Sequence, residues 1–133
     1  MLSHVTVGIS DIDRALGFHR PLMETLGWEE KFATRNPPGP WAGWKLPDAD
    51  RPLFIATEPF DREAPADPGN GPMVAFRVCS RAEVDTAYAL ALELGATDAG
   101  APGQRPQYHA AYYGAYFRDP DGNKLCVVCH EGP

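Results

Sequence analysis

The chain has 133 residues, a formal net charge of −6 and an isoelectric point near 5.1. This length fits one domain or two very small fused modules, and it allows roughly two-thirds of the extended chain's surface to be buried. The acidic balance argues against nucleic acid or an anionic membrane as a partner, because both reward clustered Lys and Arg.

Cysteine usage and apolar patterning favour a soluble protein of the cytoplasm. The three cysteines do not make a disulfide framework, and an odd number favours a reducing compartment. No apolar run approaches the length of a membrane span. The first residues, MLSHVTVGIS, have no basic stretch before an apolar one, so we expect that they are not a signal peptide. We therefore expect a cytoplasmic protein.

The first part of the chain predicts a strand, a helix and further strands. Residues 2–9 alternate, and His4 and Thr6 lie on the polar face of a half-buried strand. Ser10 or Asp11 can cap the following helix, which contains Pro21 and ends at Gly27. Strands are then expected at residues 28–34, 41–46 and 53–57.

A Pro/Gly-rich segment then divides the chain. Residues 59–72 contain four prolines and two glycines with acidic residues between them, and this composition predicts a linker between module 1 (1–58) and module 2 (73–133). The pattern restarts at 73–78, where Met73 and Arg77 lie on the polar face of a strand. Ser80 followed by Glu83 forms a capping box for a helix that ends at Gly95.

The last quarter of the chain predicts a long Gly/Pro-rich loop after Gly95 and then a β-hairpin. The hairpin strands span 112–118 and 124–130, and residues 119–122 read Asp-Pro-Asp-Gly, a turn in which each residue type suits its position. This region also carries most of the side chains with site chemistry: Arg105, Tyr108, His109, Tyr116, Cys126 and His130.

The two halves repeat. A shift of 69 residues puts His4 on Met73 and aligns the apolar faces of the two first strands. Neither half has enough core to stand alone, so we expect their sheets to associate. The face that is polar in both first strands would then line a ligand space.

Four stretches carry a family resemblance: HVTVGISDIDRALGFH, LGW at 26–28, MVAFRV at 73–78 and YYGAYFRDPDGNKLCVVCHEGP. On these the chain resembles the vicinal oxygen chelate superfamily of glyoxalase I, bleomycin-resistance proteins, fosfomycin-resistance enzymes and extradiol dioxygenases, and within it a bacterial subgroup of mostly unassigned activity. The resemblance implies an α+β fold in which two βαβββ modules form a curved mixed sheet or half-barrel with helices on the outside. It also implies a homodimer.

The resemblance further implies a divalent metal ion held by the first and last strands of both modules. His4 matches the first ligand, Met73 stands in place of a histidine, Cys126 in place of a glutamate, and Ala56 near the remaining glutamate. A thioether is a poor ligand for a hard cation, so the ligand set is incomplete. The absent glutamate base argues against glyoxalase I activity.

Two metal candidates remain, His4 and Cys126, and His109 or Glu58 could complete a site only if their loops fold inward. Cys126 is either a small apolar filler or, beside His4 or Arg77, a reactive thiolate. A shared site with Cys129 is not expected, because strand residues three apart point to opposite faces.

Two functions stay open. The first is a small-molecule-binding protein with an incomplete metal-ligand set, for which the net charge would tolerate a neutral or cationic ligand. The alternative is a metal-dependent lyase or dioxygenase-type enzyme that acts on a small oxygen-rich substrate with an altered ligand shell. The predicted ligand-facing residues are His4, Thr6, Met73, Arg77, Arg105, Tyr108, His109, Tyr116 and Cys126.

Overall fold

The computed structural model describes all 133 residues, which form two compact units, Met1–Gly69 and Asn70–Pro133. These units are module 1 and module 2, and their bounds take in the segment that was predicted as a linker. Each contains a strand, a helix and three further strands, in that order. The prediction of an α+β fold built from two βαβββ modules is therefore confirmed. No helix combines the length and apolar character that a membrane crossing requires.

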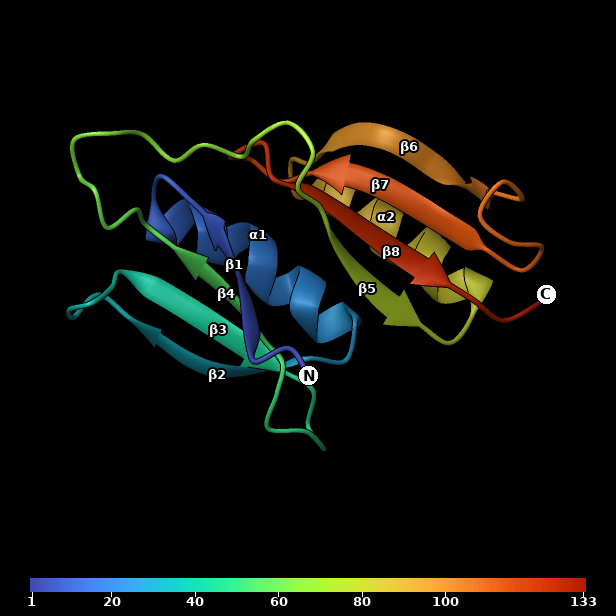
Figure 1. Ribbon diagram of the computed structural model, residues 1–133, viewed down its shortest axis with the longest axis horizontal. Coiled ribbons are helices and arrows are strands. Elements are labelled where there is room, and N and C mark those ends of the chain that lie inside the picture. The colour runs from blue at the N-terminus through green and yellow to red at the C-terminus, as the bar shows by residue number, and fades with distance from the viewer. The chain divides into compact units, whose positions relative to one another are not determined.

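Module 1 contains β1 (His4–Gly8), α1 (Ile12–Thr25), β2 (Glu29–Thr34), β3 (Trp41–Lys45) and β4 (Leu53–Thr57). The sheet order is β1-β4-β3-β2, with β1 parallel to β4 and the other pairs antiparallel. Figure 1 shows α1 lying against this sheet, and its His19 ring contacts the rings of Trp44 and Phe54 at the core of the module. Asp11 caps the helix by accepting bonds from two backbone amides of the first turn.

Module 2 repeats this topology with β5 (Val74–Val78), α2 (Arg81–Glu93), β6 (Thr97–Gln104), β7 (Tyr113–Arg118) and β8 (Lys124–Cys129). Its sheet order is β5-β8-β7-β6, and β5 runs parallel to β8. The predicted capping box is present, because Ser80 Oγ accepts the Glu83 amide at 3.2 Å and Glu83 Oε2 accepts the Cys79 amide at 3.1 Å. Figure 1 shows α2 behind this sheet.

The prediction of a long loop after Gly95 is wrong for residues 97–104, because these residues form the edge strand β6. Its pairing with β7 shifts register between Asp98 and Gly100 and again between Gly100 and Gly103. Such bulges accommodate Gly and Pro in an edge strand, where one side of the backbone needs no ladder partner. The Gly/Pro-rich composition of β6 is typical of a loop, but pairing with β7 stabilises this segment as a strand.

The β7–β8 hairpin and its turn are confirmed. Asp119 is buried, and its Oδ1 accepts the amides of Asp121 at 3.0 Å and Asn123 at 2.8 Å. Its Oδ2 accepts the side-chain amide of Asn123 at 3.0 Å. Gly122 has a φ of 89°, a left-handed conformation that suits glycine. The turn thus joins the two strands on which the pocket described below depends.

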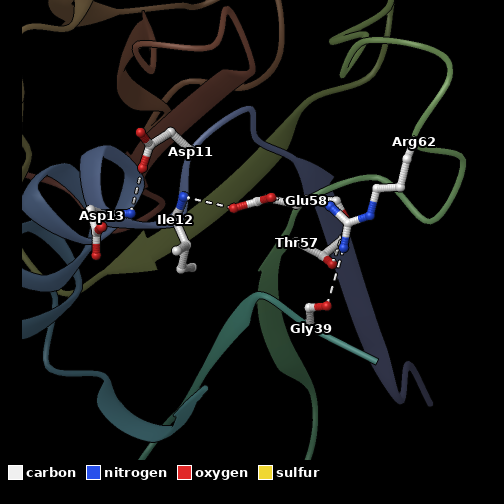
Figure 2. Close-up of polar contacts among 7 residues, drawn as sticks. All are labelled: Asp11, Ile12, Asp13, Gly39, Thr57, Glu58 and Arg62. Atoms are coloured by element: carbon white, nitrogen blue, oxygen red, sulfur yellow. Dashed lines mark hydrogen bonds and ion pairs between the residues drawn. The ribbon is translucent and has the colours of Figure 1, made fainter. Parts of the chain in front are cut away.

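Residues 59–69 of the segment predicted as a linker belong to the compact unit of module 1. Glu58 Oε2 accepts the Ile12 amide at the start of α1 at 3.2 Å, and Glu58 Oε1 pairs with Arg62 at 3.1 Å. Arg62 also donates to the carbonyl of Gly39 at 3.1 Å (Figure 2). A carboxylate suits the orphan amides at a helix N-terminus. Glu58 therefore stabilises the start of α1 and is not directed toward the His4 face of the sheet.

Candidate ligand pocket in module 2

The sheet of module 2 has one face toward α2 and one away from it. The Phe117 ring contacts Tyr88 of α2, and Tyr113 donates to Asp85 of the same helix at 2.7 Å. Because side chains alternate along a strand, the intervening Tyr116 points away from α2. Its register partner Cys126 lies on that same face.

A pocket of about 530 Å³ lies on the face away from α2. It combines apolar or aromatic surface with two cationic side chains and two phenols, and no acidic residue lines it. Its lining residues are Met73, Ala99, Gly100, Arg105, Tyr108, Tyr116 and Lys124. The structure thus brings together four of the residues predicted to face a ligand, which are Met73, Arg105, Tyr108 and Tyr116.

Beneath the pocket, two tyrosines and a thiol form a small buried cluster. The hydroxyls of Tyr112 and Tyr116 are 2.7 Å apart, and the Tyr112 hydroxyl lies 3.8 Å from Cys126 Sγ. Cys126 is fully buried and packs with Val128. Burial raises the pKa of the Cys126 thiol and of both phenols. These observations support the interpretation of Cys126 as a small apolar filler, because a buried thiol resists the deprotonation that nucleophiles and metal ligands need.

Thiol accessibility gives a direct check on this arrangement. Cys79 is exposed, whereas Cys126 and Cys129 are buried. We expect a disulfide reagent such as dithionitrobenzoate to label one thiol of the native protein rapidly and the other two only in denaturant. Cys79→Ser should remove the rapid phase. A rapid phase that persists in that variant and is lost in Cys126→Ala would instead identify Cys126 as a reactive thiolate.

The turn between β6 and β7 positions the cationic and aromatic side chains of the pocket. The Arg105 amide donates to the Tyr112 carbonyl at 3.0 Å, and the Tyr108 amide donates to the Arg105 carbonyl at 3.0 Å. The Tyr108 ring packs on the Tyr112 ring with 4.9 Å between centroids. The backbone therefore holds Arg105 and Tyr108 at the edge of the pocket.

His109 braces this turn. The Ala111 amide donates to His109 Nδ1 at 3.2 Å, so that nitrogen carries a lone pair and a neutral ring holds its proton on Nε2. His109 Nε2 lies 2.8 Å from His130 Nδ1, to which it can then donate, and the two rings are stacked. His109 was predicted to face a ligand, but its ring contacts His130 and it is not among the pocket-lining residues.

The remaining predicted residues lie outside this pocket. Arg77 is exposed on β5 and pairs in register with Val128. His4 and Thr6 are exposed on β1 of module 1, and His4 Nδ1 lies 3.0 Å from Ser3 Oγ. Their assignment to a ligand site remains a prediction.

The residues at the family's metal positions do not fit a divalent cation. Neither module gathers three or more His, Cys, Asp or Glu side chains in a group suited to a metal. Ala56 pairs in register with Val7, and the alternation from Phe54, which contacts His19 of α1, puts Ala56 on the helix side of the sheet. The alignment of Ala56 with a glutamate ligand near His4 is thereby corrected. A thioether at Met73 and a buried thiol at Cys126 are poor donors for a hard ion.

Three pocket residues were missed from the sequence, namely Ala99, Gly100 and Lys124. A signal for Lys124 existed, because it lies two residues before Cys126 on a predicted strand and so shares its face. Ala99 and Gly100 could not be identified, since their segment was predicted as a loop. The contact between His109 and His130, 21 residues apart, has no signature in the spacing.

Comparisons with known proteins agree with this fold. The family model described as "Glyoxalase/Bleomycin resistance protein/Dioxygenase superfamily" matches residues 1–127. Metallothiol transferase FosB of Shouchella clausii (strain KSM-K16) is 31% identical over 129 residues, which cover 95% of this chain and 77% of that protein.

Solved structures extend the comparison. A glyoxalase/bleomycin resistance protein from Albidiferax ferrireducens T118 matches with a TM-score of 0.82 and 32% identity, covering 97% of this chain and 98% of that one. TnmS3, an antibiotic binding protein from Streptomyces sp. CB03234, shares the fold with a TM-score of 0.67 and 22% identity, covering 97% and 94% of the two chains. This chain belongs to the glyoxalase/bleomycin resistance protein/dioxygenase superfamily.

Proposed function

We propose that this protein binds a small molecule in the pocket of module 2 and that it does so without the divalent metal usual in the family. The observation that carries the proposal is the pocket itself. Its volume of about 530 Å³ falls within the range of about 300–1,000 Å³ that is typical of ligand sites. Its lining has the composition of such sites, apolar and aromatic surface with a few convergent polar groups.

Two further points support binding. The donor set at the family's metal positions lacks the carboxylates that a hard cation needs, so a metal-free site agrees with the chemistry of the residues present. TnmS3 shares this fold and is an antibiotic binding protein, which is an example of small-molecule binding on the same architecture. The cytoplasmic location and the homodimer stay predictions.

The test is a titration of the ¹⁵N-labelled protein with a panel of small carboxylates, phosphates, amides and amines, with and without EDTA. We expect at least one class to shift the amide resonances of Gly100, Arg105 and Tyr116, with EDTA making no difference. Ala99 is exposed and lines the pocket, so Ala99→Trp should abolish these shifts.

Thr97→Trp is the matched control for this titration, because Thr97 is exposed on the same strand but does not line the pocket. It should leave the shifts intact. If no compound in the panel perturbs these resonances, or if Ala99→Trp leaves the perturbations unchanged, the proposal is wrong.

The alternative is a metal-dependent lyase or dioxygenase-type enzyme. One comparison favours it, the 31% identity to a protein named metallothiol transferase FosB. Metal analysis of protein purified without chelator separates the two functions. Stoichiometric metal that is lost on His4→Ala would support the enzyme, and no metal under any loading condition would favour the binding protein.

A further inference from the structure

We infer that the ligand of this pocket carries an oxyanion, either a carboxylate or a phosphate-type group, joined to an apolar body, and that Arg105 and Lys124 hold the oxyanion. The inference rests on the proposed function, because it names the ligand class of the same pocket. It follows from where the charges of module 2 lie and from how they are partnered.

Two cations flank one aromatic ring in the pocket. The Arg105 guanidinium carbon lies 5.5 Å from the centroid of the Tyr116 ring, and the Lys124 ammonium lies 5.4 Å from the same centroid. No Asp or Glu is among the lining residues. Because both cations line the same pocket, their like charges repel each other there, and an oxyanion bound by both would relieve that repulsion.

The guanidinium of Arg105 is held in place without an acidic partner. Its Nη2 donates to the Ala101 carbonyl at 2.8 Å and its Nη1 to the Gln104 carbonyl at 3.3 Å. By contrast, Arg20 and Arg62 of module 1 each pair with a glutamate. A guanidinium has five N–H donors, so Arg105 keeps donors for a ligand while its orientation is already fixed. Preorganised donors lower the entropy cost of binding.

The absence of a side chain at Gly100 leaves space for the Tyr116 ring and the Arg105 guanidinium, and the nearby carboxylate of Asp98 is bonded to other groups. A Cβ at Gly100 would come within 3.0 Å of the Tyr116 ring and 3.4 Å of Arg105 Nη2. Asp98 lies two residues earlier, and its Oδ1 accepts hydrogen bonds from the Gly100 amide at 2.8 Å and from the hydroxyl of Tyr88 on α2 at 2.9 Å. These bonds hold the pKa of Asp98 below its usual value. The Asp98 carboxylate therefore bonds to β6 and to α2 and does not line the pocket.

The apolar part of the ligand is inferred from exposed hydrophobic surface. Met73 is 42% exposed and Tyr108 is 62% exposed, and both line this pocket. Large apolar side chains that gather around a concave site commonly mark a binding surface. Their contact with a ligand would bury surface that otherwise remains in water.

The local charge of the pocket is opposite to that of the whole chain. The net charge is −6 and led to the expectation that a neutral or cationic ligand would be tolerated. The field inside a cleft is set by the charges that line it, and here those charges are positive. The expected ligand is therefore anionic.

The experiment compares charged and neutral probes of one shape. Benzoate, phenylphosphonate, benzamide and benzylamine are titrated into the full chain and followed through the amide resonances of Gly100 and Tyr116. We expect an oxyanion to bind at least about tenfold more tightly than benzamide, as one or two charge-assisted bonds imply. Benzylamine should not bind. The two anionic probes show whether the site prefers carboxylate or phosphonate geometry.

Charge-neutralising variants then show which side chains cause the preference for oxyanions over benzamide. Arg105→Gln and Lys124→Gln should each reduce the ratio of oxyanion to benzamide affinity by about tenfold, and added salt should weaken oxyanion binding to the native protein. Arg81→Gln is the matched control, because the Arg81 guanidinium of α2 lies 5.1 Å from the centroid of the Tyr113 ring, on the helix side of the sheet, and does not line the pocket. It should leave the ratio unchanged.

The outcomes separate this inference from the proposed function. The oxyanion assignment would be wrong if benzamide or benzylamine bound the pocket as tightly as the oxyanions and if Arg105→Gln and Lys124→Gln left the affinities unchanged. Small-molecule binding would still stand in that case. Equal losses of selectivity in Arg81→Gln and Arg105→Gln would also overturn it, since the effect would then be one of overall charge. Failure of every probe to perturb the pocket would contradict both.

Discussion

Asp119→Ala is expected to destabilise the protein by about 3–4 kcal/mol. The Asp119 carboxylate is buried and accepts three hydrogen bonds within the hairpin turn, two from backbone amides and one from the side chain of Asn123. Alanine would leave these donors without acceptors in a site that water hardly reaches. Each stranded buried donor costs about 1–3 kcal/mol, and the losses are not fully additive.

Urea unfolding measures this effect, and module 2 has its own reporters. All five tyrosines lie between residues 88 and 116, so their near-ultraviolet circular dichroism follows this module. Asp119→Asn is the close isostere and should cost less, because its carbonyl oxygen can still accept the backbone amides. Asp48→Ala, at an exposed position between β3 and β4, should cost under about 0.5 kcal/mol. Near-native stability of Asp119→Ala would show that the turn does not depend on its carboxylate.

The same substitution should weaken ligand binding. Tyr116 and Lys124 stand on the two strands that this turn joins, and their ring-to-ammonium contact spans the hairpin. A turn that opens at Asp119 would loosen that contact before the rest of the sheet is affected. Stability and pocket geometry are therefore coupled through one buried carboxylate.

Trp44→Ala is expected to cost about 3–5 kcal/mol, the usual loss when a buried aromatic side chain is deleted. Trp44 is 2% exposed, and its ring lies 6.0 Å from that of His19 on α1 and 6.1 Å from that of Phe54 on β4. Its removal would leave a cavity where the helix meets the sheet of module 1. The surrounding strands can collapse into such a space only in part.

Thermal unfolding followed by tryptophan fluorescence tests this prediction, because all three tryptophans of the chain, Trp28, Trp41 and Trp44, lie in module 1. Trp41→Ala is the matched control. It deletes the same side chain from the same strand, but Trp41 is partly exposed and its ring packs on that of Phe32, with 4.9 Å between centroids. We expect this control to cost less than half as much. Equal losses in the two variants would show that Trp44 has no special place in the core.

The predictions that the structure confirmed rest on interactions between residues close in the chain. Asp11 and Ser80 cap helices through amides within three residues, and the turn after β7 closes through residues 119–123. Alternation placed Cys126 and Val128 on one face, where they pack together. A local stretch of sequence contains all the residues that take part in such interactions, so its pattern is enough to predict them.

The predictions that were wrong or missing concern contacts between distant segments. Residues 97–104 carry the composition of a loop, yet pairing with β7 makes them a strand. Ala56 was aligned by position, but the register with β1 decides which face it occupies. Glu58 became a partner of the first turn of α1, 46 residues away. Propensity cannot foresee these outcomes, since tertiary pairing overrides it.

The sequence by itself determined the repeated strand–helix–strands order, the caps and the hairpin, because each depends on residues that meet within one turn or one strand. Only the tertiary structure decided which side chains share the pocket. Arg105 comes from a turn, Lys124 from β8 and Gly100 from a bulged edge strand. Their proximity follows from strand order and register, and these are set by packing across the whole sheet.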